Sequence, residues 1–438
     1  MPGERPAAPG DRTGPPVAIV GAGLAGLACA RALSAAGLAV RVLESAEAVG
    51  GRLRTRRQQG FLIDRGFQVL TDAYPEARGQ LDLEELELAA FEPGALVRWR
   101  GRFVRFADPF RRPLTSLPAL WGGPGTLADR LRVLRLRRRA LSGPLDALWR
   151  RPEQRTSAVL TELGFSAEFI DGFLRPFLGG IFLESALETS SRVLDFVWRM
   201  FSTGRACLPA RGMQAIPEQL ASGLPRGTVE LGRPVAGLER DAGRWRLRLG
   251  GGETIAAEQL VLATDGPAAA GLLAGLPDAP KLAAPAMRAV TQLCFAAPSA
   301  PIAAPLLVLN GSGSGRIAHL CVPSRVQPSY APPGQELVAV TLLGDAPEAD
   351  ERLEALVQAE LSGWFGSAVG AWRPLCVDRV RAALPVQPPG VLEPAERPVG
   401  FAPGLFVCGD HRDQGSINGA LRSGRRAAEA LLAERRSR

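Results

Sequence analysis

The chain has 438 residues, 46% of them hydrophobic, and a formal net charge of +8 at pH 7. This length can bury a large core and predicts two domains. No apolar run is long enough to cross a bilayer, so we expect no transmembrane helix. The six cysteines are dispersed without a CxxC pair, which favours reduced thiols in a cytoplasmic protein and predicts no metal site.

The chain begins with a segment rich in proline and glycine. We expect residues 1–16 to form a disordered tail. The apolar run behind it starts a strand rather than a secretory leader, so no signal peptide is predicted.

Val17 to Glu44 reads as a strand, a glycine turn, a helix and a second strand that ends in an acid. The turn is Gly21-x-Gly23-x-x-Gly26. Its glycines allow a tight bend, the approach of a pyrophosphate to the backbone, and close packing of helix on strand. The helix N-terminus favours phosphate, and Glu44 is placed to accept hydrogen bonds from a ribose 2′-hydroxyl. We therefore predict a dinucleotide site.

A second glycine pair follows, in Gly50-Gly51-Arg52. An arginine at this point can bind phosphate oxygens with both arms of its guanidinium group. The alternative is an ordinary turn with a solvated charge.

Arginines gather between Arg98 and Arg155, together with leucines that share one helical face. Such a basic amphipathic helix can lie on an anionic membrane surface. We prefer the simpler interpretation of a solvated arginine face. Nucleic acid is not expected as a partner, because no recognition motif accompanies the charge. The residues concerned are Arg130, Arg132, Arg135, Arg137, Arg138 and Arg139, with Leu127, Leu131, Leu134 and Leu141.

An aromatic block follows, and it is a candidate wall for a hydrophobic substrate. Aromatic residues one helical turn apart are more often core, and we prefer that interpretation. The block comprises Phe165, Phe169, Phe173, Phe177, Phe182, Phe196, Trp198 and Phe201.

Near the C-terminus, Leu405 to Val407 form a short apolar run that leads to Gly409 and Asp410, with a helical pattern from Ile417. The carboxylate of Asp410 can hold polyol hydroxyls. The helix N-terminus can point N–H groups at an electron-rich carbonyl edge such as that of a flavin. The alternative is an acid that caps the helix.

Together the two ends resemble the flavin-containing amine oxidase superfamily, which includes phytoene desaturases, protoporphyrinogen oxidases and monoamine oxidases. The resemblance implies an α/β, two-domain, FAD-binding Rossmann-type (glutathione-reductase-like) fold, with a mixed sheet plus helices in the substrate domain. It implies an FAD-binding domain of residues 17–80, 205–275 and 390–438, and a substrate-binding domain of residues 81–204 and 276–389.

The same resemblance implies contacts to FAD from segments spread along the whole chain. These residues are Gly21, Gly23, Leu24, Ala25, Gly26, Glu44, Ser45, Gly50, Gly51, Arg52, Leu53, Gly66, Phe67, Val235, Thr264, Gly409, Asp410, Ser416, Ile417 and Ala420.

Segments Ile63–Leu70 and Phe173–Phe182 are more similar to bacterial phytoene-desaturase-like proteins than to amine oxidases. The only lysine, Lys281, lies well before the strand where amine oxidases carry theirs, and Gln292 is at about that place. Ser416 stands where amine oxidases have an aromatic residue. The resemblance therefore implies a desaturase or dehydrogenase that moves hydride from a polyene, isoprenoid or tetrapyrrole-like substrate to flavin.

The catalytic residues stay open, with Gln68, Arg175 and His411 as candidates. The electron acceptor, oxygen or a quinone, and the direction of the redox reaction also stay open, as does peripheral contact with a membrane. Two alternatives remain: a flavin amine oxidase, and a non-redox lipid- or prenyl-binding protein on the same fold, as in the GDP-dissociation inhibitors of Rab proteins.

Overall fold

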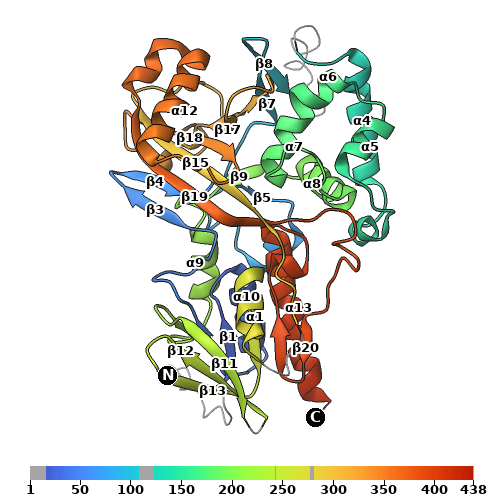
Figure 1. The fold of residues 1–438 in the computed structure, drawn as a ribbon, viewed down its shortest axis with the longest axis vertical. Coiled ribbons are helices and arrows are strands. Elements are labelled where there is room, and N and C mark those ends of the chain that lie inside the picture. The colour runs from blue at the N-terminus through green and yellow to red at the C-terminus, as the bar shows by residue number, and fades with distance from the viewer. Residues whose placement is uncertain (1–15, 108–122, 242, 277–280, 438) are drawn as a thin grey trace, which may run out of the picture.

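The structure is a computed structural model that describes residues 16–107, 123–241, 243–276 and 281–437 (Figure 1). The tail expected for residues 1–16 lies outside the described residues except for Pro16. None of the described helices is long and apolar enough to span a bilayer. All six cysteines are free thiols and only Cys376 is not fully buried, in agreement with the core thiols predicted.

A six-stranded sheet carries the glycine turn. The predicted strand, helix and strand are β1 (Val17–Val20), α1 (Leu24–Ala35) and β2 (Val40–Leu43). The strand order is β10-β2-β1-β14-β21-β20, so the two apolar runs from opposite ends of the chain are separated only by β14. The first five strands are parallel and β20 is antiparallel. The other strands are β10 (Val229–Glu230), β14 (Leu260–Leu262), β20 (Gly400–Ala402) and β21 (Leu405–Val407).

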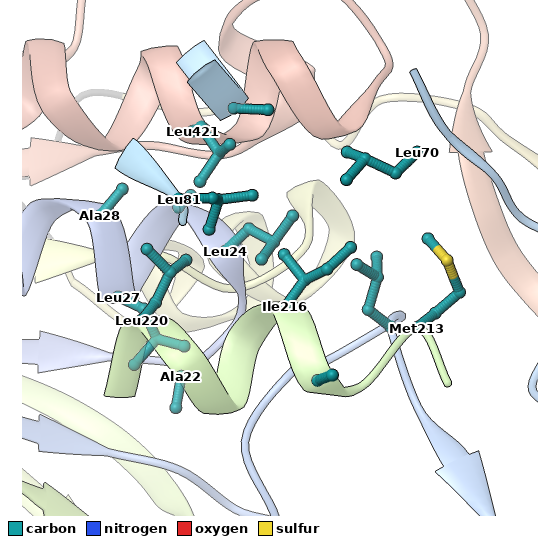
Figure 2. Packing of buried hydrophobic residues seen from close by; sticks show 14 of the residues in the cluster. Ala22, Leu24, Leu27, Ala28, Leu70, Leu81, Met213, Ile216, Leu220 and Leu421 are labelled. Atoms are coloured by element: carbon teal, nitrogen blue, oxygen red, sulfur yellow. The ribbon is translucent and has the colours of Figure 1, made fainter. Parts of the chain in front are cut away.

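Both faces of this sheet are covered, which explains its continuously apolar strands. Val17 and Ile19 belong to a core shared with α1, α9 (Ala215–Ser222) and α13 (Ile417–Arg436). Figure 2 shows leucines of these three helices packed together. Ala18 and Val20 belong to a second core on the other face.

The second core is completed by a β-meander and by α10 (Gly266–Ala274). The meander consists of β11 (Val235–Asp241), β12 (Arg244–Leu249) and β13 (Thr254–Ala257). The side chains of β12 alternate between exposed and buried, as its alternating sequence requires of a half-buried strand.

A seven-stranded sheet lies at the other end of the molecule (Figure 1), in the order β19-β15-β18-β17-β16-β7-β8. It is mixed, because β16 and β7 are parallel and the other pairs antiparallel. The helix α12 (Asp350–Phe365) packs its buried leucines on one face, against Leu293 and Phe295 of β15. Residues that alternate with these two face the opposite way. The strands are β7 (Gly94–Trp99), β8 (Arg102–Ala107), β15 (Met287–Ala297), β16 (Leu307–Asn310), β17 (Ile317–Cys321), β18 (Glu336–Leu343) and β19 (Arg373–Pro385).

Helices from the middle of the chain stand beside this sheet (Figure 1). Their core contains most of the predicted aromatic block, and Phe165, Phe169, Phe173 and Phe177 contact one another in series. The block is therefore mainly core, as we preferred. The elements are α4 (Leu127–Leu141), a 3₁₀ turn (Leu145–Arg150), α5 (Thr156–Glu162), α6 (Ala167–Phe169), a π turn (Ile170–Leu174), α7 (Arg175–Phe182) and α8 (Ser191–Thr203).

Short elements connect the two large sheets. They are the hairpin of β3 (Thr55–Gln58) and β4 (Phe61–Asp64), the small sheet of β5 (Leu70–Thr71), β9 (Ala206–Leu208) and β6 (Ala89–Ala90), and the helices α2 (Pro75–Gln80) and α11 (Pro323–Val326). The exact domain boundaries stay a prediction.

Candidate functional site

A cavity of about 1250 Å³ extends from the carboxyl ends of the parallel strands to the seven-stranded sheet. Ligands of open parallel sheets bind at this edge. Of the twenty residues predicted to contact the cofactor, all except Gly26 line this cavity. The lining therefore unites segments that lie far apart in sequence.

The glycine turn at the end of β1 has the predicted geometry. Gly21 has φ +105°, and a Cβ added to it would lie 2.9 Å from the carbonyl oxygen of Ala263. A Cβ on Gly26 would lie 2.0 Å from the Gly21 oxygen, so Gly26 serves the close packing of α1 and not the cavity surface. Around Gly23 the space is open, with no atom within 4 Å of an added Cβ. The opening lies directly before the N-terminus of α1, where an anion is stabilised.

Glu44 ends β2 and lines the cavity, although only 7% of its surface is exposed. Its Oε2 accepts a hydrogen bond from the N–H of Ala22 at 2.8 Å, and its Oε1 accepts one from the N–H of Ala46 at 3.0 Å. Two backbone donors thus fix the carboxylate beside the glycine turn. A carboxylate has about four acceptor positions, so capacity remains for ribose hydroxyls.

The second glycine pair forms a sharp turn under the first. Gly50 and Gly51 have φ +118° and +59°, and the N–H of Gly50 donates to the Ala22 oxygen at 2.8 Å. A Cβ on Gly50 would lie 2.2 Å from the Leu53 oxygen. The turn therefore requires glycine at Gly50.

Arg52 and Asp410, which are 358 residues apart, form a two-armed ion pair at the centre of the cavity lining. The Nη1–Oδ2 and Nη2–Oδ1 distances are 2.7 and 2.6 Å. Nη1 also donates to the Ala383 oxygen at 2.9 Å. The sequence assigned these side chains separately to phosphate and to polyol hydroxyls; the structure places them in direct contact.

Gly409 and the start of α13 complete this end of the site. Gly409 has φ +146°, and its N–H donates to the Ser423 hydroxyl at 2.9 Å. Ser416 caps α13 by accepting a hydrogen bond from the N–H of Gly419 at 3.0 Å. Since Ser416, Ile417 and Ala420 all line the cavity, the first turn of α13 faces it.

The three candidate catalytic residues have different surroundings. Gln68 lines the cavity, but its Nε2 donates to the backbone oxygens of Arg52 and Arg65 at 3.0 and 3.1 Å. Arg175 is not among the lining residues, because its guanidinium group pairs with Asp171 one turn earlier in the chain and donates to the Ser185 oxygen. The structure therefore does not bring Arg175 to the cavity.

His411 is also absent from the cavity lining, although it follows Asp410 directly. It is 2% exposed, and neither ring nitrogen has a hydrogen-bond partner among the described residues. Burial lowers the pKa of His411 to about 4, so the ring is neutral at pH 7. It lies beside Gly409, where an added Cβ would be 2.6 Å from its ring. His411 is thus a neighbour of the predicted cofactor residues.

The cavity walls include residues that sequence reasoning did not single out. They come from the loop before α2, from the end of α7, from α8 and from β19, and most are apolar. No local motif marks them, because they reach the cavity only through helix packing and strand register. They include Tyr74, Leu183, Val197, Met200, Val380, Ala383 and Leu384.

The positions that distinguish amine oxidases can also be located. Lys281 is exposed and is not part of the lining. Gln292 is buried on β15, where its Nε2 donates to Cys294 Sγ at 3.3 Å. Ser416 lines the cavity as a helix cap. Within the described residues, no amino group and no aromatic pair occupies these places.

The fold and the site together define an α/β protein with a long cavity at the carboxyl ends of its parallel strands. The family model described as flavin containing amine oxidoreductase matches residues 24–432, so the chain belongs to this family. It is therefore a flavin-dependent oxidoreductase, and the predicted fold class and superfamily are confirmed.

Similar proteins share different parts of the chain. Hydroxysqualene dehydroxylase of Rhodopseudomonas palustris is 28% identical over 455 residues, covering 96% of this chain and 99% of the relative. Protoporphyrinogen oxidase 2 of Arabidopsis thaliana is 29% identical over 177 residues, which cover 38% of this chain but only 32% of that protein. A solved structure of cyclohexylamine oxidase from Brevibacterium oxydans has a TM-score of 0.70 at 20% identity, with 97% and 99% of the two chains covered. This last likeness shows the fold alone.

Proposed function

We propose that the protein uses FAD to transfer hydride between its flavin ring and a hydrophobic substrate, as a desaturase or dehydrogenase of a polyene, isoprenoid or tetrapyrrole-like compound. One observation carries the proposal. The cavity that begins at the glycine turn of β1 continues without interruption to apolar walls on α7, α8 and β15. A cofactor and a hydrophobic molecule can therefore meet inside the protein.

FAD fits the residues present better than a smaller flavin. The open space before Gly23 suits a pyrophosphate, and Glu44 suits the ribose of an adenosine. Arg52 and Asp410 lie farther along the same cavity, with the first turn of α13 beyond them. The lining thus offers binding groups along the whole length of a dinucleotide.

The protein's own contribution to the chemistry is position and electrostatics. The N-terminus of α13 brings free N–H groups and the positive end of a helix dipole, which would stabilise negative charge on a bound ring. The charge of Arg52 is balanced by Asp410, and the pair offers both donors and acceptors to the cofactor. FAD, when bound, supplies the hydride acceptor or donor.

The substrate end of the cavity is apolar. Ile181 and Leu183 from the end of α7 and Val197 and Met200 from α8 line it, and Phe201 adds an aromatic surface. Such walls favour hydrocarbon over charged groups. The relative that aligns over its full length is named a hydroxysqualene dehydroxylase, which supports an isoprenoid substrate.

Two experiments in sequence test this proposal. The purified protein is first denatured and its chromophore analysed, and we expect FAD. The yellow protein is then mixed under anaerobic conditions with polyenes, porphyrinogens and amines, and the flavin absorbance is followed. Bleaching by a polyene or porphyrinogen is expected.

Other results would contradict the proposal. Rapid bleaching by simple amines would make the protein an amine oxidase. A colourless protein that takes up no FAD would leave the alternative of a non-redox lipid- or prenyl-binding protein. Reoxidation by air or by a soluble quinone would identify the electron acceptor.

Peripheral membrane contact is a further part of the proposal. Leu127, Leu131 and Leu134 are 55%, 65% and 38% exposed, and they are three of the four large exposed apolar side chains among the described residues. They share one face of α4, with Arg135 and Arg138 also exposed. Apolar side chains flanked by arginines suit an anionic lipid surface, from which a hydrophobic substrate can be drawn.

A further inference from the structure

Three polar side chains lie side by side on the inner face of the seven-stranded sheet. Gln292 on β15 is directly opposite Thr341 on β18, and Thr341 is directly opposite His319 on β17. Opposed residues of antiparallel strands share one face, with Cβ atoms about 5 Å apart. We call these three residues the polar row.

The polar row is buried, and most of its hydrogen-bonding atoms have no partner among the described residues. Its members are at most 3% exposed. Gln292 Oε1, Thr341 Oγ1 and both ring nitrogens of His319 have no partner among the described residues. Buried polar groups are nearly always paired, since leaving one unpaired costs about 1–3 kcal/mol. Several such atoms in one place indicate that a partner from outside the chain belongs there.

The face that carries the polar row is the face that borders the large cavity. Val290, two residues before Gln292 on β15, lines that cavity. Gln292 itself lines an adjoining chamber of about 10 Å³, large enough for about one water molecule. Phe67 and Gln68 line both spaces, so they form the partition between them.

His319 reaches the same partition from the other end of the row. Its ring meets the edge of Phe67 with centroids 5.4 Å apart. A Cβ added to Gly180, a residue of the large cavity lining, would lie 2.8 Å from His319 Nδ1. Gly180 therefore packs directly against the His319 ring, and a larger residue there would collide with it.

The row is neutral. Burial lowers the pKa of His319 to about 4, so its ring carries one donor and one acceptor nitrogen at pH 7. Of the nearby carboxylates, Asp378 pairs with Arg56, whereas Asp64 accepts hydrogen bonds from the uncharged donors Thr55, Tyr330 and the N–H of Met213. Burial raises the pKa of Asp64, which disfavours its charged form. A group that both donates and accepts, such as a hydroxyl, can satisfy Gln292 Oε1 and Thr341 or His319 together.

We propose that Gln292, Thr341 and His319 bind the hydroxyl group of an otherwise hydrocarbon substrate. The inference rests on the proposed function, because it assigns the hydrocarbon part of the molecule to the apolar cavity. It narrows the substrate class to an alcohol, such as an isoprenoid or polyene alcohol. Phe67 and Gly180, which contact His319 on the cavity side, separate the polar row from the hydrocarbon part of the substrate.

The chain allows a direct test because it contains only two histidines, His319 and His411. With ring-labelled histidine, the purified protein gives two imidazole NMR signals, which a His319→Gln variant assigns. Farnesol and farnesene serve as probes, since they share a C15 skeleton and differ in the hydroxyl. We expect farnesol to shift the His319 signal and farnesene to leave it in place.

Matched variants examine the rest of the row. Thr341→Val keeps the side-chain shape but removes the hydroxyl, and it should lower the preference for farnesol over farnesene about 3- to 10-fold. Thr161→Val makes the same change on the exposed face of α5 and should leave the preference unchanged. Thermal unfolding of each variant shows whether the fold is kept.

The inference is overturned if both probes, or neither, move the His319 signal, or if Thr341→Val keeps the wild-type preference. These results do not depend on redox chemistry. A yellow protein that is reduced by polyenes but binds farnesol without a His319 shift overturns this inference alone. A colourless protein overturns the proposed function whatever the NMR result.

Discussion

At the scale of single residues, the glycines of the first turn have separable roles. The space before Gly23 is open and faces the cavity, whereas Gly26 is enclosed by the backbone of Gly21. One glycine therefore leaves room for a ligand, and the other leaves room for the fold. Alanine at Gly23 should therefore weaken ligand binding, and alanine at Gly26 should lower the stability of the fold.

We predict that Gly23→Ala keeps the free energy of unfolding of FAD-stripped protein within about 0.5 kcal/mol of wild type and lowers FAD affinity at least tenfold. Gly26→Ala should destabilise the stripped protein by about 1–3 kcal/mol, because its Cβ has no space. Urea unfolding and FAD titration measure the two effects. Equal loss of stability in both variants would contradict the assignment.

A second prediction at the scale of residues concerns how much the ion pair of Arg52 and Asp410 stabilises the fold. The Asp410 side chain is only 5% exposed, so Arg52→Met would leave a buried carboxylate without its partner. We expect a loss of about 2 kcal/mol in FAD-stripped protein, part of which the double variant with Asp410→Asn recovers. Urea unfolding of wild type, Arg52→Met, Asp410→Asn and the double variant gives the coupling energy of the pair. Additive effects would show that the pair does not act as a unit.

At the scale of elements, the helix α4 leaves three of its five leucines exposed. Its arginine-rich sequence allowed either a solvated face or a membrane contact. The structure buries Leu136 and leaves Leu127, Leu131 and Leu134 exposed. A solvated arginine face does not account for exposed leucines on the same helix, so the structure adds support for the membrane contact.

We predict that Leu131→Glu lowers binding to vesicles of anionic lipid several-fold and changes stability by no more than about 0.5 kcal/mol, since the side chain is exposed. Sedimentation with vesicles measures the bound fraction. Vesicles of zwitterionic lipid and the variant Thr161→Glu are the controls. Equal binding by wild type and Leu131→Glu would contradict membrane contact through α4.

At the scale of the whole molecule, stability should depend on pH through His319. Burial lowers its pKa from 6.5 to about 4. As the pH falls below 6.5, His319 becomes protonated in the unfolded chain. In the folded protein it stays neutral until about pH 4. Stability is therefore lost over this interval, by about 2 kcal/mol between pH 7 and pH 5 for this group.

Urea unfolding of wild type and His319→Gln at pH 7 and pH 5 measures this contribution. The variant should lose about 2 kcal/mol less than wild type between the two values. The buried His411, which is unchanged in both proteins, cancels in the comparison. An equal loss in both proteins would show that His319 is not held neutral.

How much of the structure could be predicted from the sequence depends on how far apart in the chain the interacting residues lie. The β1–α1–β2 unit could be predicted in detail because its glycines, apolar runs and acid act through neighbours in sequence. The cofactor segments from both ends could be predicted because each carries a motif of its own. The substrate walls could not, because Val197, Met200 and Val380 look like ordinary core residues.

The sequence alone determined the class of this protein, because the backbone turns at Gly21, Gly50 and Gly409 depend on residues that are close in sequence. Tertiary structure decided which side chains meet. It paired Arg52 with Asp410 across 358 residues and aligned Gln292, Thr341 and His319 through strand register. Register and packing depend on the free energy of the whole core, which no single segment encodes.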